Sequence, residues 1–254
     1  MAEELPRLHI VVPVFNESGN LPRLFASFGN LHSQFADRLK TEFILVDDGS
    51  TDGTADAARG LTDGLPLTIL THETNLGPGR AFSSAFEHLS NKLTDEDWVA
   101  TMEGDNTSRH ELLAQMLTRS DEGYDVILAS PYMYGGGITN APTHRVLLSH
   151  IANGFAKEFL GCHGLITVSS FFRLYRGSAL RTLMNRYGSG IIESSGFECM
   201  LEMVMKMVHL KMAVSEVPMV LDTSARVGKS KMKLLRTIRG YLGLYRKRRR
   251  WSAA

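Results

Sequence analysis

The stretch Asp97-Trp98-Val99-Ala100-Thr101-Met102-Glu103-Gly104-Asp105-Asn106 is an apolar run closed by an acid, a glycine and a second acid. Its β-branched and aromatic members predict a buried strand. Ligands of open α/β sheets gather beyond the carboxyl ends of the strands, so we expect Glu103 and Asp105 to project toward a substrate. Two carboxylates one residue apart can hold a hard divalent cation against a diphosphate. The alternative is that both acids only cap the next helix.

The same pattern of a strand, a polar loop and a helix occurs three times before this stretch. The apolar runs are 8–14, 42–46 and 67–70, and a segment with apolar residues at helical spacing follows each loop. Four such units in succession are typical of right-handed parallel crossovers. The sequence therefore predicts an α/β fold with a Rossmann-like, doubly wound and mostly parallel sheet.

Further acids follow the other predicted strands, namely Glu17, Asp47 and Asp48. They should converge with Glu103 and Asp105 at one sheet edge, where a cation would let this acidic surface attract a phosphorylated ligand. No G-x-G-x-x-G follows the first strand, and no G-x-x-x-x-G-K-[ST] occurs in the chain. These absences argue against a dinucleotide oxidoreductase and an NTPase.

The composition is that of an ordinary globular protein. The chain has 254 residues, of which 43% are hydrophobic and 22% charged, enough for one large domain or two small ones. Its two cysteines form neither a disulfide framework nor a metal spacing, which favours a reducing compartment. We find no signal peptide and no spanning apolar segment. We therefore expect a cytoplasmic protein, peripheral on the cytoplasmic face of a membrane.

The net charge of +1 conceals a strong asymmetry along the chain. Residues 226–254 carry eleven Lys or Arg and no acid, so the tail is strongly basic and residues 1–225 are net acidic. Apolar residues at three- and four-residue spacing opposite the cationic face predict an amphipathic helix between 231 and 251. This helix suits an anionic membrane surface. Packing on the body, or on a second subunit, is the alternative.

Several segments resemble a known family when taken together. Residues 12–17 (VPVFNE), 45–54 (LVDDGSTDGT), 75–79 (NLGPG) and 103–105 (EGD) resemble family 2 glycosyltransferases of the GT-A fold. Arg145 with 151–153 (IAN), 170–176 (SFFRLYR), 216–218 (EVP) and 226–231 (RVGKSK) resemble the dolichyl- or polyprenyl-phosphate mannosyltransferase branch. The likeness spans roughly 8–233. It implies a single GT-A domain, which we place at 1–225. With the basic and amphipathic pattern described above, we expect residues 226–254 to form a basic acceptor loop and an amphipathic membrane-surface tail.

The resemblance also implies roles for individual residues. The nucleotide-sugar donor would be bound by Pro13, Phe15, Asn16, Glu17, Asp47, Asp48, Gly77, Arg80 and Glu103. Mg²⁺ or Mn²⁺ would be held by Glu103 and Asp105. Asp105 and Arg145 are candidate catalytic residues on this ground. Glu202 is a third candidate, which its position one helical turn after Glu198 suggests independently of the resemblance. The acceptor phosphate would meet Arg173, Arg226, Ser230 and Lys231.

The chain departs from the branch at defined positions. The first metal-binding acid is Glu103, one methylene longer than Asp, and Thr107 stands where the branch often has a Gln ligand. Residues 129–132 (ASPY) lack an Arg expected near the donor, and 167–171 (TVSSF) lack an Asp. These changes leave the donor sugar and the acceptor open.

The function that follows is an inverting transfer of a mannose- or glucose-type sugar from a nucleotide donor to a polyprenyl phosphate. Such an acceptor is already an anion and needs no strong base. Transfer to a hydroxyl of a saccharide or small molecule is an alternative, with Glu198 or Glu202 as base. A non-catalytic nucleotide-sugar-binding module is another. The acidic sheet edge argues against a nucleic-acid partner. The sequence leaves a homo-oligomer open.

Overall fold

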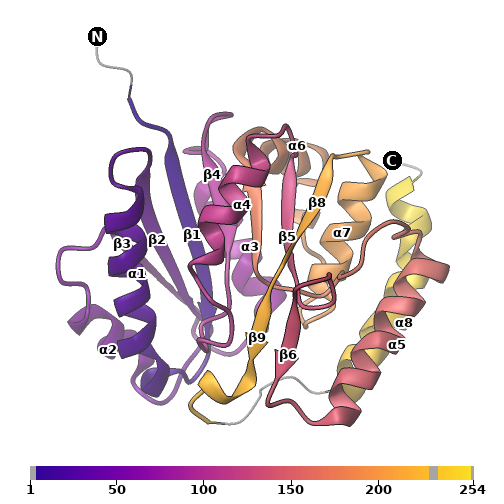
Figure 1. Ribbon diagram of the computed structural model, residues 1–254, viewed down its shortest axis with the longest axis horizontal. Helices are drawn as coiled ribbons and strands as arrows, with labels where there is room; N and C mark the ends of the chain where they lie inside the picture. The colour runs from indigo at the N-terminus through magenta and orange to yellow at the C-terminus, as the bar shows by residue number, and fades with distance from the viewer. Residues whose placement is uncertain (1–3, 229–233, 253–254) are drawn as a thin grey trace.

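The computed structural model describes residues 4–228 and 234–252. Its centre is a seven-stranded sheet of order β3-β2-β1-β4-β7-β5-β8 (Figure 1). The strands are β1 (Arg7–Val14), β2 (Lys40–Asp47), β3 (Leu67–Thr71), β4 (Trp98–Thr101), β5 (Val126–Ser130), β7 (Arg173–Arg176) and β8 (Val214–Pro218). A second, two-stranded parallel sheet joins β6 (Gly137–Thr139) to β9 (Val220–Asp222).

The pairing within the large sheet is mostly parallel, as the sequence predicts. β1 pairs in parallel with β2 and β4, β2 with β3, and β5 with β8. β7 departs from this direction because it runs antiparallel to both β4 and β5. Its four residues, RLYR, are too short and too polar to signal a strand by period.

Helices cover both faces of the sheet. They are α1 (Leu21–Phe35), α2 (Thr54–Gly60), α3 (Pro78–Leu89), α4 (Leu112–Ser120), α5 (Thr143–Leu160), α6 (Gly177–Tyr187), α7 (Cys199–His209) and α8 (Leu234–Ser252). Short 3₁₀ turns occupy Ser18–Asn20, Gly188–Gly190 and Thr223–Ala225. α1, α2 and α4 share one apolar core, and α3, α5, α6, α7 and α8 share the other.

Side-chain alternation along β1 explains how the sheet serves both cores. Leu8, Ile10 and Val12 enter the core beneath α1, whereas Val11 enters the opposite one. Successive strand residues point to opposite faces, so a continuous apolar run is what a strand buried on both sides requires.

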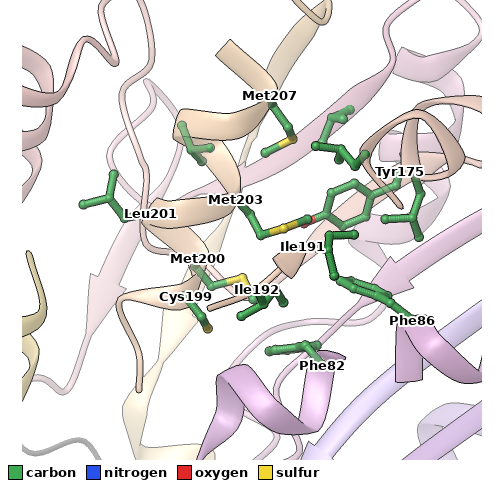
Figure 2. Packing of buried hydrophobic residues seen from close by; sticks show 14 of the residues in the cluster. Phe82, Phe86, Tyr175, Ile191, Ile192, Cys199, Met200, Leu201, Met203 and Met207 are labelled. Carbon is green, nitrogen blue, oxygen red and sulfur yellow. The ribbon is translucent and has the colours of Figure 1, made fainter. Parts of the chain in front are cut away.

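Methionines fill much of the core under α7. Met200, Met203 and Met207 are fully buried, and Figure 2 shows Met203 directed at the ring of Tyr175, with Phe86 nearby. Unbranched, polarisable side chains fill irregular space well. This packing holds α7, and the loop that leads into it, against the sheet.

The C-terminal helix α8 belongs to the same body. Tyr241, Leu244 and Trp251 are buried in the core that contains α7. The boundary between 225 and 226 therefore does not divide two hydrophobic cores. Among the described residues, no helix is both long enough and apolar enough to cross a membrane.

Candidate active site

A cavity of about 640 Å³ lies beyond the carboxyl ends of β1, β2, β4, β5 and β8. Its lining includes acids from the strand-end loops, namely Glu17, Asp48, Glu103 and Asp105. It also includes apolar and aromatic side chains, namely Tyr132, Val146, Phe171, Phe197, Met219 and Leu221. The cavity therefore joins a cation-binding edge to an apolar surface.

Glu103 and Asp105 form part of the cavity wall directly after β4. The glycine between them packs so closely against β1 that an added Cβ would lie 2.6 Å from Cγ1 of Val14. Ser108 donates its hydroxyl to Glu103 at 2.7 Å. Burial and the neighbouring charge of Asp105 raise the pKa of Glu103 to about 7. Two close carboxylates without a cation resist double ionisation, which is the electrostatic condition that a divalent cation relieves.

Asp105 also meets a cation from a distant part of the chain. Its Oδ2 accepts a hydrogen bond from Nε of Arg226 at 2.6 Å, and the Arg226 guanidinium makes a second close contact with the same oxygen. Its Oδ1 accepts from the hydroxyl of Thr107 at 2.6 Å. The carboxylate is thus held in place on both sides.

Asn20 fastens the loop that carries Arg226. Its side chain accepts from the amide of Val227 at 2.9 Å and donates to the carbonyl of Val227 at 3.2 Å. Asn106 in turn donates to the carbonyl of Asn20 at 2.9 Å. The late loop is therefore bonded to the segments that follow β1 and β4, so it closes over the acid pair.

The loops after β1 and β2 are bound to each other. Asn16 has a positive φ of 52°, and its amide donates to Ser50 Oγ at 2.8 Å. The side chain of Asn16 accepts from the amide of Thr51 at 2.8 Å. The amide of Glu17 donates to Thr54 Oγ1 at 3.0 Å. Pro13, Phe15 and Glu17 line the cavity, and Asn16 shapes the turn beside them.

Asp47 and Asp48 organise backbone around the cavity. Asp47 accepts from the amide of Ser50 at 3.1 Å. Asp48 accepts from the amides of Leu76 at 2.9 Å and Gly77 at 2.7 Å. Its carboxylate also lies 2.7 Å from Nδ1 of His72. Both carboxylates therefore position loops, and Asp48 also lines the cavity.

The start of α3 lies against the loop before α7. An added Cβ at Gly77, whose φ is +95°, would meet the carbonyl oxygen of Ser195 at 2.3 Å, and one at Gly79 would meet that of Ser194 at 1.8 Å. The amide of Gly79 donates to the Ser195 carbonyl at 3.0 Å. Both glycines are required because backbone approaches backbone here.

Arg80, Arg173 and Glu202, all predicted as site residues, lie away from the cavity. Arg80 forms an ion pair with Glu87 at 3.2 Å on the outside of α3, because its helical position faces away from the cavity. Arg173 is fully buried in β7 and donates to the carbonyls of Ser170 and Val168. Neither side chain lines the cavity.

Glu202 is the third. It is fully buried, accepts from the amides of Glu193 and Ser194 at 2.8 Å each, and pairs with Lys206. These partners use both carboxylate oxygens, and the residue does not line the cavity. A general base must reach the proton it removes, so Glu202 does not fit that role.

The remaining predicted residues lie where side chains are not described. Arg145 belongs to α5, but its side chain lies outside the described part of the structure. Ser230 and Lys231 lie outside the described residues.

Glu198 contributes a carboxylate to the cavity wall. It stands at the start of α7, beside Gly196 and Gly240. Among the described residues its buried Oε2 has no hydrogen-bond partner. Sequence reasoning proposed it only beside Glu202 and did not find Asn20, since a lone Asn after a strand carries no signal of a contact made 207 residues away.

Comparison with known proteins identifies the family. Residues 9–184 match the profile described as glycosyl transferase family 2. The chain belongs to this family. It is a nucleotide-sugar glycosyltransferase with a GT-A fold.

Curated relatives of this glycosyltransferase cover most of its length. It is 27% identical over 236 residues to the polyprenol monophosphomannose synthase of Mycolicibacterium smegmatis, covering 89% of this chain and 81% of that one. It is 26% identical over 227 residues to the undecaprenyl-phosphate mannosyltransferase of Micrococcus luteus, covering 89% and 87%. It is 27% identical to the dolichol-phosphate mannosyltransferase of Pyrococcus furiosus, of which it spans 59%.

Solved structures show the same fold. Glucosyl-3-phosphoglycerate synthase from Mycobacterium tuberculosis, in complex with Mn²⁺, uridine diphosphate and glucosyl-3-phosphoglycerate, superposes with a TM-score of 0.62. The sequence identity is 18%, and the match covers 94% of this chain and 79% of that one. The same protein was also solved with Mg²⁺ and uridine diphosphate, at a TM-score of 0.63 and 16% identity.

The acid pair of this glycosyltransferase fits a hard divalent cation. Carboxylate oxygens are the ligands that Mg²⁺ and Mn²⁺ prefer, and Mg²⁺ commonly uses one or two carboxylates plus substrate phosphates. Within the described residues no cluster of three or more His, Cys, Asp or Glu that could hold a metal ion is found. Further ligands would have to come from the diphosphate and from water.

Proposed function

We propose that this enzyme transfers a mannose- or glucose-type sugar, with inversion, from a nucleotide sugar to a polyprenyl phosphate at a membrane surface. The observation that carries the proposal is the contact of Asp105 with Arg226 in a cavity that apolar side chains also line. An acid for a metal, a cation for a phosphate and apolar side chains for a lipid chain then line one cavity. The printed names of the three relatives support the same acceptor class.

The donor would lie along the loops after β1, β2 and β4. Pro13, Phe15 and Glu17 would contact the base and ribose, where they line the cavity. Glu103 and Asp105 would hold Mg²⁺ or Mn²⁺. When bound, that cation neutralises charge developing on the departing nucleoside diphosphate. Thr107 keeps the Asp105 carboxylate oriented through its 2.6 Å hydrogen bond.

The acceptor phosphate would approach from the side of Arg226. One of its oxygens attacks the anomeric carbon, and the bond from that carbon to the diphosphate oxygen breaks on the opposite face. The configuration inverts, and the electron pair leaves with the nucleoside diphosphate. Because the acceptor is an anion, no side chain has to remove a proton. The planar guanidinium of Arg226 matches the geometry of a phosphate. It would therefore release Asp105 and bind the acceptor phosphate instead.

Two substitutions test the proposal with matched controls. With nucleotide sugar, metal and a short polyprenyl phosphate in detergent, Asp105→Asn should lower kcat roughly a hundredfold, because charge stabilisation of several kcal/mol is lost. Arg226→Gln should raise the KM for the acceptor at least about tenfold, since a charge-assisted hydrogen bond disappears. Asp95→Asn and Arg80→Gln, which lie outside the cavity, should change neither. Full activity of Asp105→Asn would overturn the proposal.

A second candidate function rests on Glu198. The unpartnered oxygen of this buried carboxylate could take a proton from an acceptor hydroxyl. Glu198→Gln should then lower kcat by about 10²–10⁴-fold with a saccharide acceptor. If the acceptor is a lipid phosphate, the same variant should keep a kcat within a few-fold of the wild type. Comparing the two acceptor classes on one variant separates the functions.

A further inference from the structure

The helices α5 and α8 lie side by side at one end of the molecule, where Figure 1 draws them in red and yellow. Arg248 of α8 donates to the carbonyl of Phe159 in the last turn of α5. Its guanidinium also covers the ring of Tyr245 at 4.1 Å. A cation at a helix C-terminus satisfies carbonyls that lack an intrahelical partner. This contact thereby links the C-terminal part of α8 to the end of α5.

The outward face of α5 is apolar. Leu147, Ile151 and Phe159 are 60%, 58% and 52% exposed. The half-buried Phe155 stacks on Phe159 with the ring centroids 5.1 Å apart. Large apolar side chains gathered on one helix face are what a binding surface displays, whereas scattered ones need no explanation. This exposed apolar face was not predicted from the sequence.

α8 also carries exposed apolar side chains, and cations run beside them. Ile238, Leu242 and Tyr245 are exposed and recur after four and three residues, so they form one line along the helix. The opposite line, formed by Tyr241, Leu244 and Trp251, is buried in the core. Beside the exposed apolar line run the exposed cations Arg239, Arg246 and Arg250. Residues 226–254 contain no acid to neutralise them.

The same two helices form part of the cavity wall. Val146 and Ser149 of α5 and Thr237 of α8 line the cavity, one or two residues from the exposed Leu147, Ile151 and Ile238. A lipid whose chain lies on the outer face would therefore have its phosphate within reach of the cavity. The cavity-lining side chains and the exposed apolar side chains therefore lie on the same turns of α5 and α8.

We infer that the α5–α8 face, defined by Leu147, Ile151, Phe159, Ile238, Leu242 and Tyr245 with the row Arg239, Arg246 and Arg250, docks on an anionic lipid bilayer. An apolar helix face bordered by cations inserts shallowly, and its cations meet acidic headgroups. The inference rests on the proposed function, to which it adds the helices that meet the membrane and the charge of the lipids they bind. A two-fold contact between copies would bring two such cationic rows together, so charge favours the bilayer.

The experiment measures sedimentation of the full chain with vesicles of phosphatidylcholine alone or with about 30% phosphatidylglycerol. The wild type should bind the anionic vesicles, and added salt should weaken this binding. Leu147→Ser/Ile151→Ser/Phe159→Ser should lower the partition coefficient at least about tenfold, because buried apolar area is lost. Arg239→Gln/Arg246→Gln/Arg250→Gln should lower it and flatten its salt dependence.

Matched variants control for composition and folding. Leu5→Ser/Val208→Ser removes exposed apolar side chains elsewhere, and Arg23→Gln/Arg59→Gln/Arg186→Gln removes the same charge from α1, α2 and α6. Both should bind vesicles like the wild type. Because every substituted side chain is exposed, melting temperatures should stay within a few degrees. If the apolar triple does not fold, the charge triple carries the same test.

Transfer to a detergent-dispersed short-chain acceptor separates this inference from the proposed function. Normal transfer with no vesicle binding by the wild type would overturn the docking surface and leave the function standing. Vesicle binding without transfer to any lipid phosphate would support the surface and overturn the function. A dimer that dissociates in the apolar triple would instead make this face an interface between copies, which also overturns the inference.

Discussion

Glu198 and Glu202 lie one helical turn apart, yet their carboxylates meet opposite surroundings. Glu198 faces the cavity with one oxygen unpartnered among the described residues. Glu202 is saturated by two backbone amides and Lys206. Two acids at i and i+4 would repel on an exposed face. At the residue scale, therefore, one of them serves the fold and the other is available to a ligand.

Glu202→Gln should destabilise the protein. The substitution leaves the Lys206 ammonium buried without its counter-charge, at a cost of about 3–5 kcal/mol in the free energy of unfolding. Urea unfolding measures this, with the exposed Glu87→Gln as control, which should cost under about 1 kcal/mol. The folded fraction should keep its kcat. A large loss of kcat at unchanged stability would restore Glu202 as a base.

His9 makes stability depend on pH. It is fully buried in β1, and burial lowers its pKa despite the nearby carboxylates of Glu42 and Asp97; Arg7 and Lys92 lower it further. The unfolded chain therefore binds a proton near pH 6.5 that the folded chain does not. Above that pH His9 is neutral in both states, so it does not lower the free energy of unfolding. As the pH drops toward the folded pKa, the free energy of unfolding falls by up to about 1.4 kcal/mol per pH unit.

The pH dependence can be isolated with His9→Gln. Chemical unfolding of both proteins between pH 5 and 8 should show a smaller slope for the variant below about pH 6.5. Above that pH the two curves should run parallel. Equal slopes throughout the range would mean that His9 titrates alike in both states.

At the scale of elements, the start of α3 depends on a close approach to the loop before α7. Gly79 and Gly29 are both helical, which makes them a matched pair. An added Cβ at Gly79 would lie 1.8 Å from the Ser194 carbonyl, whereas at Gly29 it would meet nothing within 4 Å. The loop that carries Gly196 and Glu198 into the cavity is thus placed by the glycine of another element.

Gly79→Ala should displace that loop. We expect a loss of about 1–3 kcal/mol in stability, as overpacking costs, together with weaker binding of a nucleoside diphosphate. Gly29→Ala should instead raise stability by roughly 0.5–1 kcal/mol through helix propensity. Thermal unfolding with and without the nucleotide measures both effects, since a bound ligand raises the melting temperature. Equal behaviour of the two variants would contradict the close packing.

At the scale of the whole molecule, α8 completes the core and also forms half of the proposed docking face. Trp251 donates its indole N–H to Glu193 at 2.9 Å, and Lys206 lies 4.7 Å from its ring. Glu193 also pairs with Lys247 at 3.5 Å. The basic C-terminal segment therefore packs on the body along one side while its other side stays exposed.

Trp251→Ala should unfold the protein more readily. Removing a buried indole costs about 3–5 kcal/mol. Tyr245→Ala, on the exposed side of the same helix, should cost under about 1 kcal/mol. Urea midpoints of the two variants test whether α8 is part of the body. If Trp251→Ala is as stable as the wild type, residues 226–254 form a separate unit.

The sheet and one cluster of the site were predictable from sequence. Each predicted strand among the first four occurs close to its expected range, because the apolar pattern of a strand reports local burial. Parallel strands share an edge for their carboxyl ends, which brought Glu17, Asp48, Glu103 and Asp105 to one cavity. The antiparallel β7 was not predictable, because four residues with two arginines show no strand pattern.

The order of residues is sufficient for a doubly wound fold and for an acid pair at its rim, since strand patterns and strand-end loops are local properties. The tertiary structure alone decides that Arg226 reaches Asp105, that Glu202 is buried while Glu198 faces the cavity, and that α5 and α8 lie side by side. Each of these depends on which helix faces pack together. Packing joins residues far apart in the chain, so local sequence periodicity carries no record of it.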